Sequence, residues 1–351
     1  MGPKAPSELK RYYIAYMDML GYKDFFQKHA EQIPQLLNSI CAVISNAKDY
    51  IAKVNQSQIL HSYADMDISM KMYSDNILLC LEIGETQFEI VKLLTFLSIV
   101  ADVQREFVVK YGLFLRGGVT IGEMSFNEDF VFGQGVIDGV EMEARANYPR
   151  IMLSQSIVDI LFQMHYISDS NMKSCVEIMN KSQSGNPISL EEQELLKAYA
   201  PQISNELFSM RWKYNLVVED ADGANVLNYL YNLSPQMMIS GECWQSVLKL
   251  LNIYFPQDYD MVVSDEYNYA DMMQRHKEKV KEKLLIYGKY DDIETSDIKS
   301  AEMREKVFKK YLWVMKFHNF IAQKENLQGQ MINAHVNCDG RFIKINLGVI
   351  Q

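Results

Sequence analysis

The order of hydrophobic and polar positions along the first 165 residues predicts short strands separated by amphipathic helices. Arg11–Met19 is aromatic and apolar, which is typical of a strand. Phe25–Val54 repeats its apolar positions at intervals of three and four, which predicts helix, and Pro34 lies near a predicted helix start. Met70–Ile83 predicts two strands around a tight turn at Ser74-Asp75-Asn76, with one kinked strand as the alternative.

The pattern continues with a second long helix and a buried strand. Phe88–Tyr111 carries a single apolar stripe that stops at Gly112, and Leu113–Ile121 is apolar enough to be a buried strand that ends at Gly122. Shorter elements are expected at Phe130–Gly135 (strand and turn), Val136–Ala146 (helix), Arg150–Leu153 (strand) and Gln155–Met164 (helix).

This order of elements predicts an α+β sheet that carries helices on one face and is related to the ferredoxin-like arrangement. We expect a core at residues 1–165, a polar insertion at 166–205, and a remaining part at 206–351. In that last part, Trp212–Glu219 predicts a strand. Asp271–Lys324 is charged and mostly helical, and we expect it to form a long arm or a helix that supports dimerisation.

Composition narrows the function classes. The chain has 351 residues and a net charge of −10, which argues against a protein that grips duplex nucleic acid but leaves room for a nucleotide-sized anion. Its five cysteines are scattered and never form CxxC, so a reducing compartment fits best. The sequence has no apolar stretch long enough to cross a bilayer, no phosphate loop and no GxSxG motif. We expect a cytoplasmic protein that binds neither membrane nor nucleic acid.

Two acids stand out by their positions. Asp18 ends the first predicted strand just before a glycine, and Asp75 lies at the tip of the predicted hairpin. If the two strands are neighbours, both carboxylates emerge at one edge of the sheet, where they can bind a pair of divalent cations. The alternative is that each aspartate only stabilises a turn.

Two basic residues add to this picture. Arg116 lies inside the apolar stretch LFLRGGVTI and needs an anionic partner, either a phosphate or a structural carboxylate. Lys71 precedes Asp75 by four residues and therefore shares its face on a regular strand. It can contact a nucleobase, or it can be an edge lysine that prevents aggregation.

Four segments resemble the catalytic domain of class III nucleotidyl cyclases: IAYMDMLGYKDFF, KMYSDNILLCLEI, LFLRGGVTIGEM and FVFGQGVIDGVEMEARANYPRIML. The resemblance implies that Asp18, Met19 and Asp75 bind two Mg²⁺ or Mn²⁺ ions, that Arg116 touches the substrate phosphates, and that Lys71 reads the base. It also implies a homodimer whose sites lie between the subunits.

The chain departs from the purine cyclases of this family. Ile137 and Glu141 stand where those enzymes carry an asparagine and an arginine, and Arg145 is a candidate replacement. Phe130 stands at the second base-reading position, where it can narrow the pocket and stack on a smaller base. Tyr50 is a further aromatic residue that could close the base pocket, or simply pack near a helix end.

These departures, together with KYLWVMKFHNF, resemble the bacterial pyrimidine cyclases of antiphage (Pycsar-type) defence. That resemblance implies conversion of UTP or CTP to a cyclic monophosphate and pyrophosphate, with a separate effector protein that reads the product. The alternatives are a purine cyclase, another two-metal palm enzyme such as a diguanylate cyclase or a polymerase, and a degenerate cyclase fold that senses nucleotides.

Overall fold

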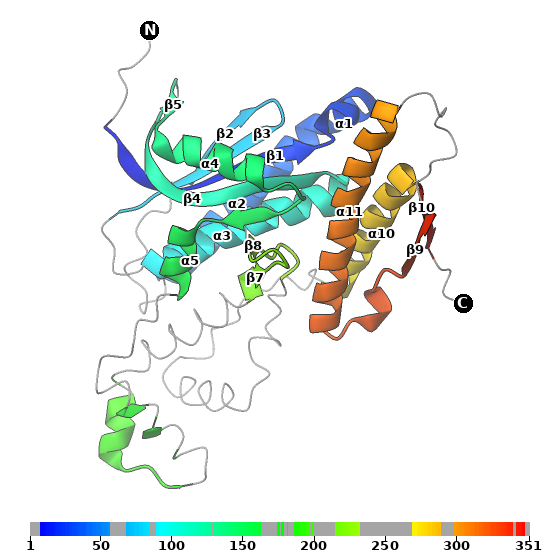
Figure 1. The fold of residues 1–351 in the computed structure, drawn as a ribbon. Coiled ribbons are helices and arrows are strands. Elements are labelled where there is room, and N and C mark those ends of the chain that lie inside the picture. The colour runs from blue at the N-terminus through cyan, green and yellow to red at the C-terminus, as the bar shows by residue number, and fades with distance from the viewer. Residues whose placement is uncertain are drawn as a thin grey trace.

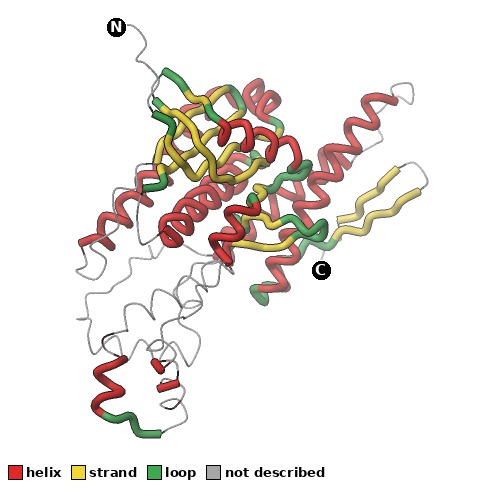
Figure 2. Tube along the Cα trace, turned by 60° about the vertical axis from the view of Figure 1, so that its left-hand side comes forward, coloured by secondary structure: helices red, strands yellow, loops and turns green. Residues whose placement is uncertain are grey.

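A computed structural model gives the chain as an α+β fold in which helices pack on a large central sheet (Figure 1). A pair of long C-terminal helices lies beside the sheet, and a two-stranded ribbon lies next to that pair (Figures 1 and 2). Among the residues described, no helix is long and apolar enough to cross a membrane. The structure describes residues 8–56, 68–84, 89–127, 129–162, 174–175, 177–178, 181, 186–196, 198, 215–231, 269–288, 298–339 and 342–347.

The first half of the chain follows the predicted order of strands and helices. Its elements are β1 (Lys10–Leu20), α1 (Tyr22–His29), α2 (Ile33–Gln56), β2 (Ile68–Tyr73), β3 (Asn76–Glu82), α3 (Glu89–Glu106) and β4 (Phe114–Phe126). The two-strand form of the hairpin is confirmed, because Ser74 and Asp75 connect β2 and β3. Gly112 ends the second long helix in a left-handed conformation after a π-helical turn, Phe107–Tyr111.

The helical structure predicted over Phe25–Val54 and the helix start near Pro34 are confirmed, but the range holds two helices. A 3-10 turn at Ala30–Gln32 separates α1 from α2. Pro34 lies in the first turn of α2, where a missing N–H group is tolerated. Both helices contribute to one apolar face, with Phe25 from α1 and Ile40 from α2 buried in the same core, and their shared apolar period hides the break.

The strand order confirms the predicted fold class. β1 lies between β3 and β4 and is antiparallel to both, while β2 pairs with β3 at the edge. This order is that of a ferredoxin-like sheet. Three short strands extend the sheet beyond β4: β6 (Ile151–Leu153), β8 (Asn225–Leu227) and β7 (Val217–Glu219). The strand predicted at Trp212–Glu219 is therefore shorter than expected, and residues 212–214 lie outside the described part.

Alternate residues of β1 face two different cores. Tyr13, Ala15 and Met17 belong to the large core that includes residues of α2 and α3. Tyr12 and Ile14 belong to a smaller cluster on the other face, beneath α4 (Gln134–Arg145). The expectation of helices on one face was thus wrong for α4. The smaller cluster matters for function, because Asp18 has the same parity as Tyr12 and Ile14.

The prediction that Gly122 ends a strand was also wrong, since β4 continues to Phe126. A Cβ atom at Gly122 would lie 2.3 Å from the Cα atom of Gly135 in α4. Gly122 therefore permits a close crossing of α4 over β4 rather than a turn. The chain between and after these elements forms β5 (Val131–Phe132), which pairs with β4, and α5 (Gln155–Phe162), which follows β6.

The C-terminal helices α10 (Tyr269–Gly288) and α11 (Ile298–Lys324) form an antiparallel pair beside the sheet, where His276 and Tyr311 pack against Phe114 of β4. Met273 and Leu284 of α10 and Phe308 and Ile321 of α11 are buried in the same core as β1. The expectation of a long arm was therefore wrong, and a role in dimer support stays a prediction. The chain then forms η3 (Gln328–Gln330) and the ribbon of β9 (Ala334–Asp339) and β10 (Phe342–Leu347).

The predicted domain limits stay predictions. Of the polar insertion expected at 166–205, the structure describes only short pieces, and where these are regular they are helical.

Candidate functional site

Asp18 lies near the end of β1, on the face covered by α4. It pairs in register with Asn76 of β3 on one side and with Arg116 of β4 on the other. β1 ends at Leu20, and Gly21 turns the chain into α1 with a left-handed φ of 81°. Because only glycine adopts this conformation without strain, the turn directly after the acid depends on Gly21.

Asp75 lies at the same edge of the sheet. It follows Ser74, whose φ is 58°, in the turn between β2 and β3. The Met19 N–H group donates a hydrogen bond of 2.9 Å to the Asp75 carbonyl oxygen, so the turn is fastened directly to the end of β1. β1, which carries Asp18, is the neighbour of β3, which follows Asp75, so the condition for the two acids to share an edge is met. The Met19 side chain is buried in the large core, so only the main chain of this residue can serve a ligand at this edge.

Arg116 joins the site through two carboxylates. Its Nε atom donates a hydrogen bond of 2.9 Å to Oδ2 of Asp18, and its Nη2 atom lies 2.7 Å from Oε1 of Glu143. Arg116 and Glu143 come from β4 and α4, so the three side chains connect the central strands to the helix above them. The arginine inside the apolar strand therefore has the anionic partners that its position requires.

Glu143 is a site residue that the sequence interpretation missed. Burial raises the pKa of its carboxyl group, Arg116 opposes that rise, and Asp18 adds to it. A signal was present in the sequence, because Glu143 follows Gly139 by four residues and Gly135 by eight. Those glycines mark the side of α4 that lies against the sheet, and a helix returns to the same side every three to four residues.

The phenol of Tyr16 lies within electrostatic reach of Glu143, Asp18 and Asp75. Burial raises the pKa of its phenol first, and the carboxylates of Glu143, Asp18 and Asp75 raise it further. Three carboxylates from three different elements therefore act on one side chain of β1. The sheet edge is strongly acidic, and Arg116 only partly compensates its charge.

The donor set at this edge fits Mg²⁺ or Mn²⁺. Carboxylate oxygens are the ligands that these hard cations prefer, and Mg²⁺ commonly binds through one or two carboxylates together with substrate phosphates. Within the described ranges no group of three or more acids, histidines or cysteines converges tightly enough to hold a metal by itself. Asp18 and Asp75 thus suit a cation that is shared with a phosphate ligand, and metal binding itself stays a prediction.

Lys71 lies on the same face of the sheet as Asp18. It stands opposite Leu78 in the register of β2 and β3, and Leu78 belongs to the small cluster beneath α4. Its Nζ atom lies 5.7 Å from the ring centroid of Phe126, near the end of β4. The sequence interpretation missed Phe126, because it ended the strand at Gly122. Phe130 is 39% exposed.

The remaining predicted residues lie away from the acids. Arg145 is exposed, and its Nε atom donates to the Glu141 carbonyl oxygen at 3.3 Å. Ile137 is 53% exposed on the outer side of α4. The structure therefore does not bring Arg145, Glu141 or Ile137 to Asp18 within one chain. Tyr50 lies in α2, and its side chain is outside the described part.

Comparisons with known proteins give partial likenesses. No protein-family model and no curated protein matches the chain. Among solved structures, the chain is similar to the adenylyl cyclase CyaB from P. aeruginosa, with 16% identity over 45% of this chain and 83% of that chain and a TM-score of 0.31. It is also similar to a class III adenylyl cyclase-like ATP-binding protein from Pseudomonas aeruginosa, with 10% identity over 43% of this chain and 34% of that chain and a TM-score of 0.28. Both are partial overlaps at low identity.

Proposed function

We propose that the chain is a nucleotidyl cyclase that converts UTP or CTP to the 3′,5′-cyclic monophosphate and pyrophosphate. The observation that carries this proposal is the meeting of Asp18 and Asp75 at one edge of the sheet, with Arg116 bonded to Asp18. Each of these three residues comes from a different cyclase-like segment of the sequence. A fold that needed the acids only as turn formers would not require an arginine from β4 at the same point.

In this proposal Asp18 and Asp75 hold Mg²⁺ or Mn²⁺. When bound, such ions lower the pKa of the attacking 3′-hydroxyl group and neutralise charge on the leaving pyrophosphate. The protein contributes mainly position and electrostatics, because phosphoryl transfer needs little covalent chemistry from side chains.

Arg116 has two tasks in the proposed site. Its bond to Asp18 fixes the orientation of that carboxylate, and its planar guanidinium group suits phosphate oxygens. Glu143 holds the other end of the guanidinium group at 2.7 Å and so limits its rotation. The arginine is therefore oriented before substrate arrives, which lowers the entropic cost of binding.

The preference for a pyrimidine is supported by the residues around Lys71. Phe126 lies against the lysine amine, and Phe130 takes the position from which the resemblance expects a second hydrogen-bonding residue. Phenylalanine cannot donate or accept such a bond, but it can narrow a pocket and stack on a small ring. A pocket with one hydrogen-bonding lysine and aromatic walls suits a smaller base.

The proposal includes a homodimer. The outer surface of β5 and α4 exposes Phe132 at 50%, Ile137 at 53% and Val140 at 41%, next to Phe130. Clustered apolar side chains on a surface commonly mark a protein interface. A two-fold partner at this surface would place residues of a second chain near α4, as a site shared between subunits requires.

We further propose that the cyclic nucleotide acts in the cytoplasm as a signal in antiphage defence, read by a separate effector protein. This part rests on the resemblance to Pycsar-type cyclases. It requires no contact between the cyclase and the effector, because the product diffuses.

The test is product analysis by mass spectrometry after incubation of the pure protein with each of the four ribonucleoside triphosphates and Mn²⁺. We expect cyclic UMP or cyclic CMP as the main product and no product from an Asp18→Ala variant prepared in parallel. A main product of cyclic AMP would favour the purine cyclase. Nucleotide binding without pyrophosphate release would favour the sensor.

A further inference from the structure

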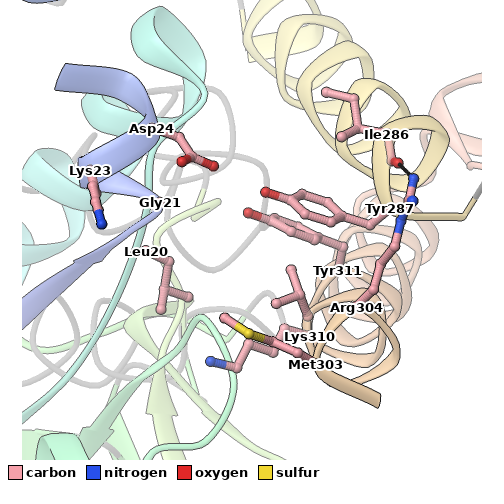
Figure 3. Close-up of a pocket in the computed structure, with 11 residues that line it drawn as sticks. Leu20, Gly21, Lys23, Asp24, Ile286, Tyr287, Met303, Arg304, Lys310 and Tyr311 are labelled. Carbon is pink, nitrogen blue, oxygen red and sulfur yellow. Dashed lines mark hydrogen bonds between the residues drawn. The ribbon is translucent and has the colours of Figure 1, made fainter. Parts of the chain in front are cut away.

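A cavity of about 460 Å³ lies between the end of β1 and the C-terminal helix pair (Figure 3). Leu20 and Gly21 form its wall on the side of the sheet, and Asp24 contributes from α1. Tyr287 of α10 and Lys310 of α11 are among the residues that close it from the other side. Leu20 and Gly21 follow Asp18 directly in the chain, so the cavity begins where the acidic edge ends.

Lys310 lies where the cavity meets the acidic edge. Its ammonium group is within electrostatic reach of Asp18, Glu143 and Arg116: the two carboxylates favour the charged form and Arg116 opposes it. Burial lowers the pKa of Lys310, which is half-buried. In Figure 3 its amine extends from α11 toward the side of the cavity that holds Leu20.

Lys310 lacks the kind of bonded partner that Lys309 and Arg304 have. Lys309 forms an ion pair of 2.7 Å with Glu305 on the same helix, and Arg304 donates to the Ile286 carbonyl oxygen at 2.7 Å. Within the described ranges, Lys310 makes neither a hydrogen bond nor an ion pair. A half-buried cation without a bonded partner is costly to keep unless a ligand pairs with it.

The cavity also holds donors that have no partner among the residues described. Tyr287 and Tyr311 stack with their ring centroids 5.4 Å apart, and both hydroxyl groups point across the cavity toward Asp24 (Figure 3). Tyr311 is only 4% exposed, yet its hydroxyl group makes no hydrogen bond to a described residue. Tyr311 lines the cavity, where its hydroxyl group can bond a polar ligand or water.

We propose that Lys310 contacts the phosphate chain of the bound nucleotide, so that the C-terminal helix pair completes the phosphate end of the site within one chain. This inference rests on the proposed nucleotide substrate. A triphosphate carries several negative charges, and a lysine ammonium group binds phosphate as a point charge. The adjoining acidic edge cannot attract that polyanion by itself, whereas Lys310, Lys23 and Arg304 add positive charge around the cavity against one carboxylate, Asp24.

The proposal is tested by binding rather than by turnover. The probes are 3′-deoxy-UTP and 3′-deoxy-CTP with Mg²⁺, which lack the attacking hydroxyl group and cannot cyclise, and the corresponding monophosphates. For the better of the two bases, we expect Lys310→Met to weaken triphosphate binding by about 10- to 100-fold, the worth of one charge-assisted hydrogen bond. Monophosphate binding should change less than about twofold, because the terminal phosphates are absent.

Two matched variants control for the loss of a nearby positive charge and for the loss of the lysine side chain itself. Lys309→Met removes the adjacent lysine, whose partner is Glu305, and should bind both probes as the unaltered protein does. Lys310→Arg keeps the charge and should recover most of the triphosphate affinity. Unchanged triphosphate binding by Lys310→Met would overturn the proposal, and so would an equal loss of triphosphate and monophosphate binding.

The outcome separates this inference from the proposed function. If the unaltered protein binds the triphosphate and releases no pyrophosphate from the natural nucleotide, the cyclase function fails while the Lys310 contact is still decided by the binding ratio. If the unaltered protein binds neither triphosphate, both proposals are overturned.

Discussion

At the scale of single residues, the site depends on two carboxylates that no local element brings together. Asp18 ends a strand and Asp75 occupies a turn, and the hydrogen bond from Met19 to Asp75 joins them. Each acid was recognisable in the sequence from its position before a turn and from the cyclase-like segment around it. Glu143 and Lys310 were not recognised, because their importance comes from the side on which α4 and α11 pack.

Removal of either acid should abolish product formation. Asp18→Ala and Asp75→Ala each delete half of the proposed cation site, and we expect a loss of at least about 100-fold in the rate of cyclic nucleotide formation. The measurement is pyrophosphate release with Mn²⁺ at saturating triphosphate. Asp159→Ala is the matched control, since that aspartate is exposed on α5 and accepts a hydrogen bond from Gln155 of the same helix.

Thermal unfolding of the same variants shows whether a loss of activity comes from loss of the fold. Asp18 and Asp75 are partly exposed at the sheet edge, and Arg116 keeps Glu143 as a partner when Asp18 is removed. We therefore expect both variants to unfold cooperatively, close to the unaltered protein. Full activity in either folded variant would remove that residue from the proposed catalytic site.

At the scale of elements, features that depend on neighbouring residues could be predicted from the sequence, whereas features that depend on packing between distant segments could not. The hairpin at Ser74-Asp75-Asn76 was predictable because turn residues act on their own neighbours. Gly122 was misread because its role is to admit a helix from a distant part of the sequence. The buried side of α11 was hidden in a charged stretch, since long lysine side chains cover apolar surface while their amines reach solvent.

The close crossing of α4 over β4 gives a prediction at this scale. In Gly122→Ala the new Cβ atom would lie 2.3 Å from the Cα atom of Gly135, so α4 must shift away from the sheet. We expect a loss of about 1–3 kcal/mol in the free energy of unfolding, together with lower activity as Glu143 moves from Arg116. Urea denaturation measures the first effect.

Gly329→Ala provides the comparison. A Cβ atom there meets nothing within 4 Å, so this variant should keep both the stability and the activity of the unaltered protein. If Gly122→Ala is equally neutral, α4 does not depend on contact between the two glycine backbones.

The C-terminal pair contains a buried chain of hydrogen bonds whose direction can be assigned. His318 Nε2 lies 2.8 Å from the Gln330 carbonyl oxygen, which can only accept, so Nε2 carries the proton and Nδ1 accepts. His276 Nδ1, at 2.9 Å, must then donate to His318 Nδ1. His276 Nε2 in turn accepts from the Tyr229 hydroxyl group at 2.9 Å. With both histidines neutral, every ring nitrogen in the chain has a hydrogen-bond partner.

This arrangement predicts acid sensitivity of the helix pair. Burial lowers the pKa of His318 to about 4 from 6.5, while Gln330 opposes the shift and Lys277 adds to it. The unfolded chain therefore binds a proton that the folded chain excludes. The resulting stability is present above about pH 6.5 and is lost as the pH falls toward about 4, by at most about 3 kcal/mol.

The measurement is the free energy of unfolding in urea at about pH 7 and about pH 4.5. His318→Gln should be less stable than the unaltered protein at the higher pH, but should lose less stability on acidification. His29→Gln changes a histidine that is 46% exposed and should follow the unaltered protein. Parallel behaviour of all three proteins would show that the buried pair does not govern the acid response.

At the scale of the whole molecule, one face of the chain is completed by its own C-terminal helices and another is left open. The large core runs without interruption from β1 to α11, so the helix pair is part of the fold that carries the acids. The surface of β5 and α4 instead exposes Phe132, Ile137 and Val140. Ile137 and Glu141 lie on this helix, and neither reaches Asp18 in the same chain. A residue from a second chain is one source of groups that could complete the site.

The dimer is therefore predicted to form through α4 and to be required for activity. Ile137→Glu places a charge on the exposed apolar side of α4, where burial against a partner would cost several kcal/mol, so we expect monomers. Size-exclusion chromatography with light scattering gives the mass, and pyrophosphate release gives the activity. Leu190→Glu makes the same change at a side chain that is 78% exposed outside this surface, and it should leave the dimer intact. An active Ile137→Glu monomer would show that one chain holds the complete site. Lys310 would then be the first candidate for the positive charge that purine cyclases obtain from the arginine at the position of Glu141.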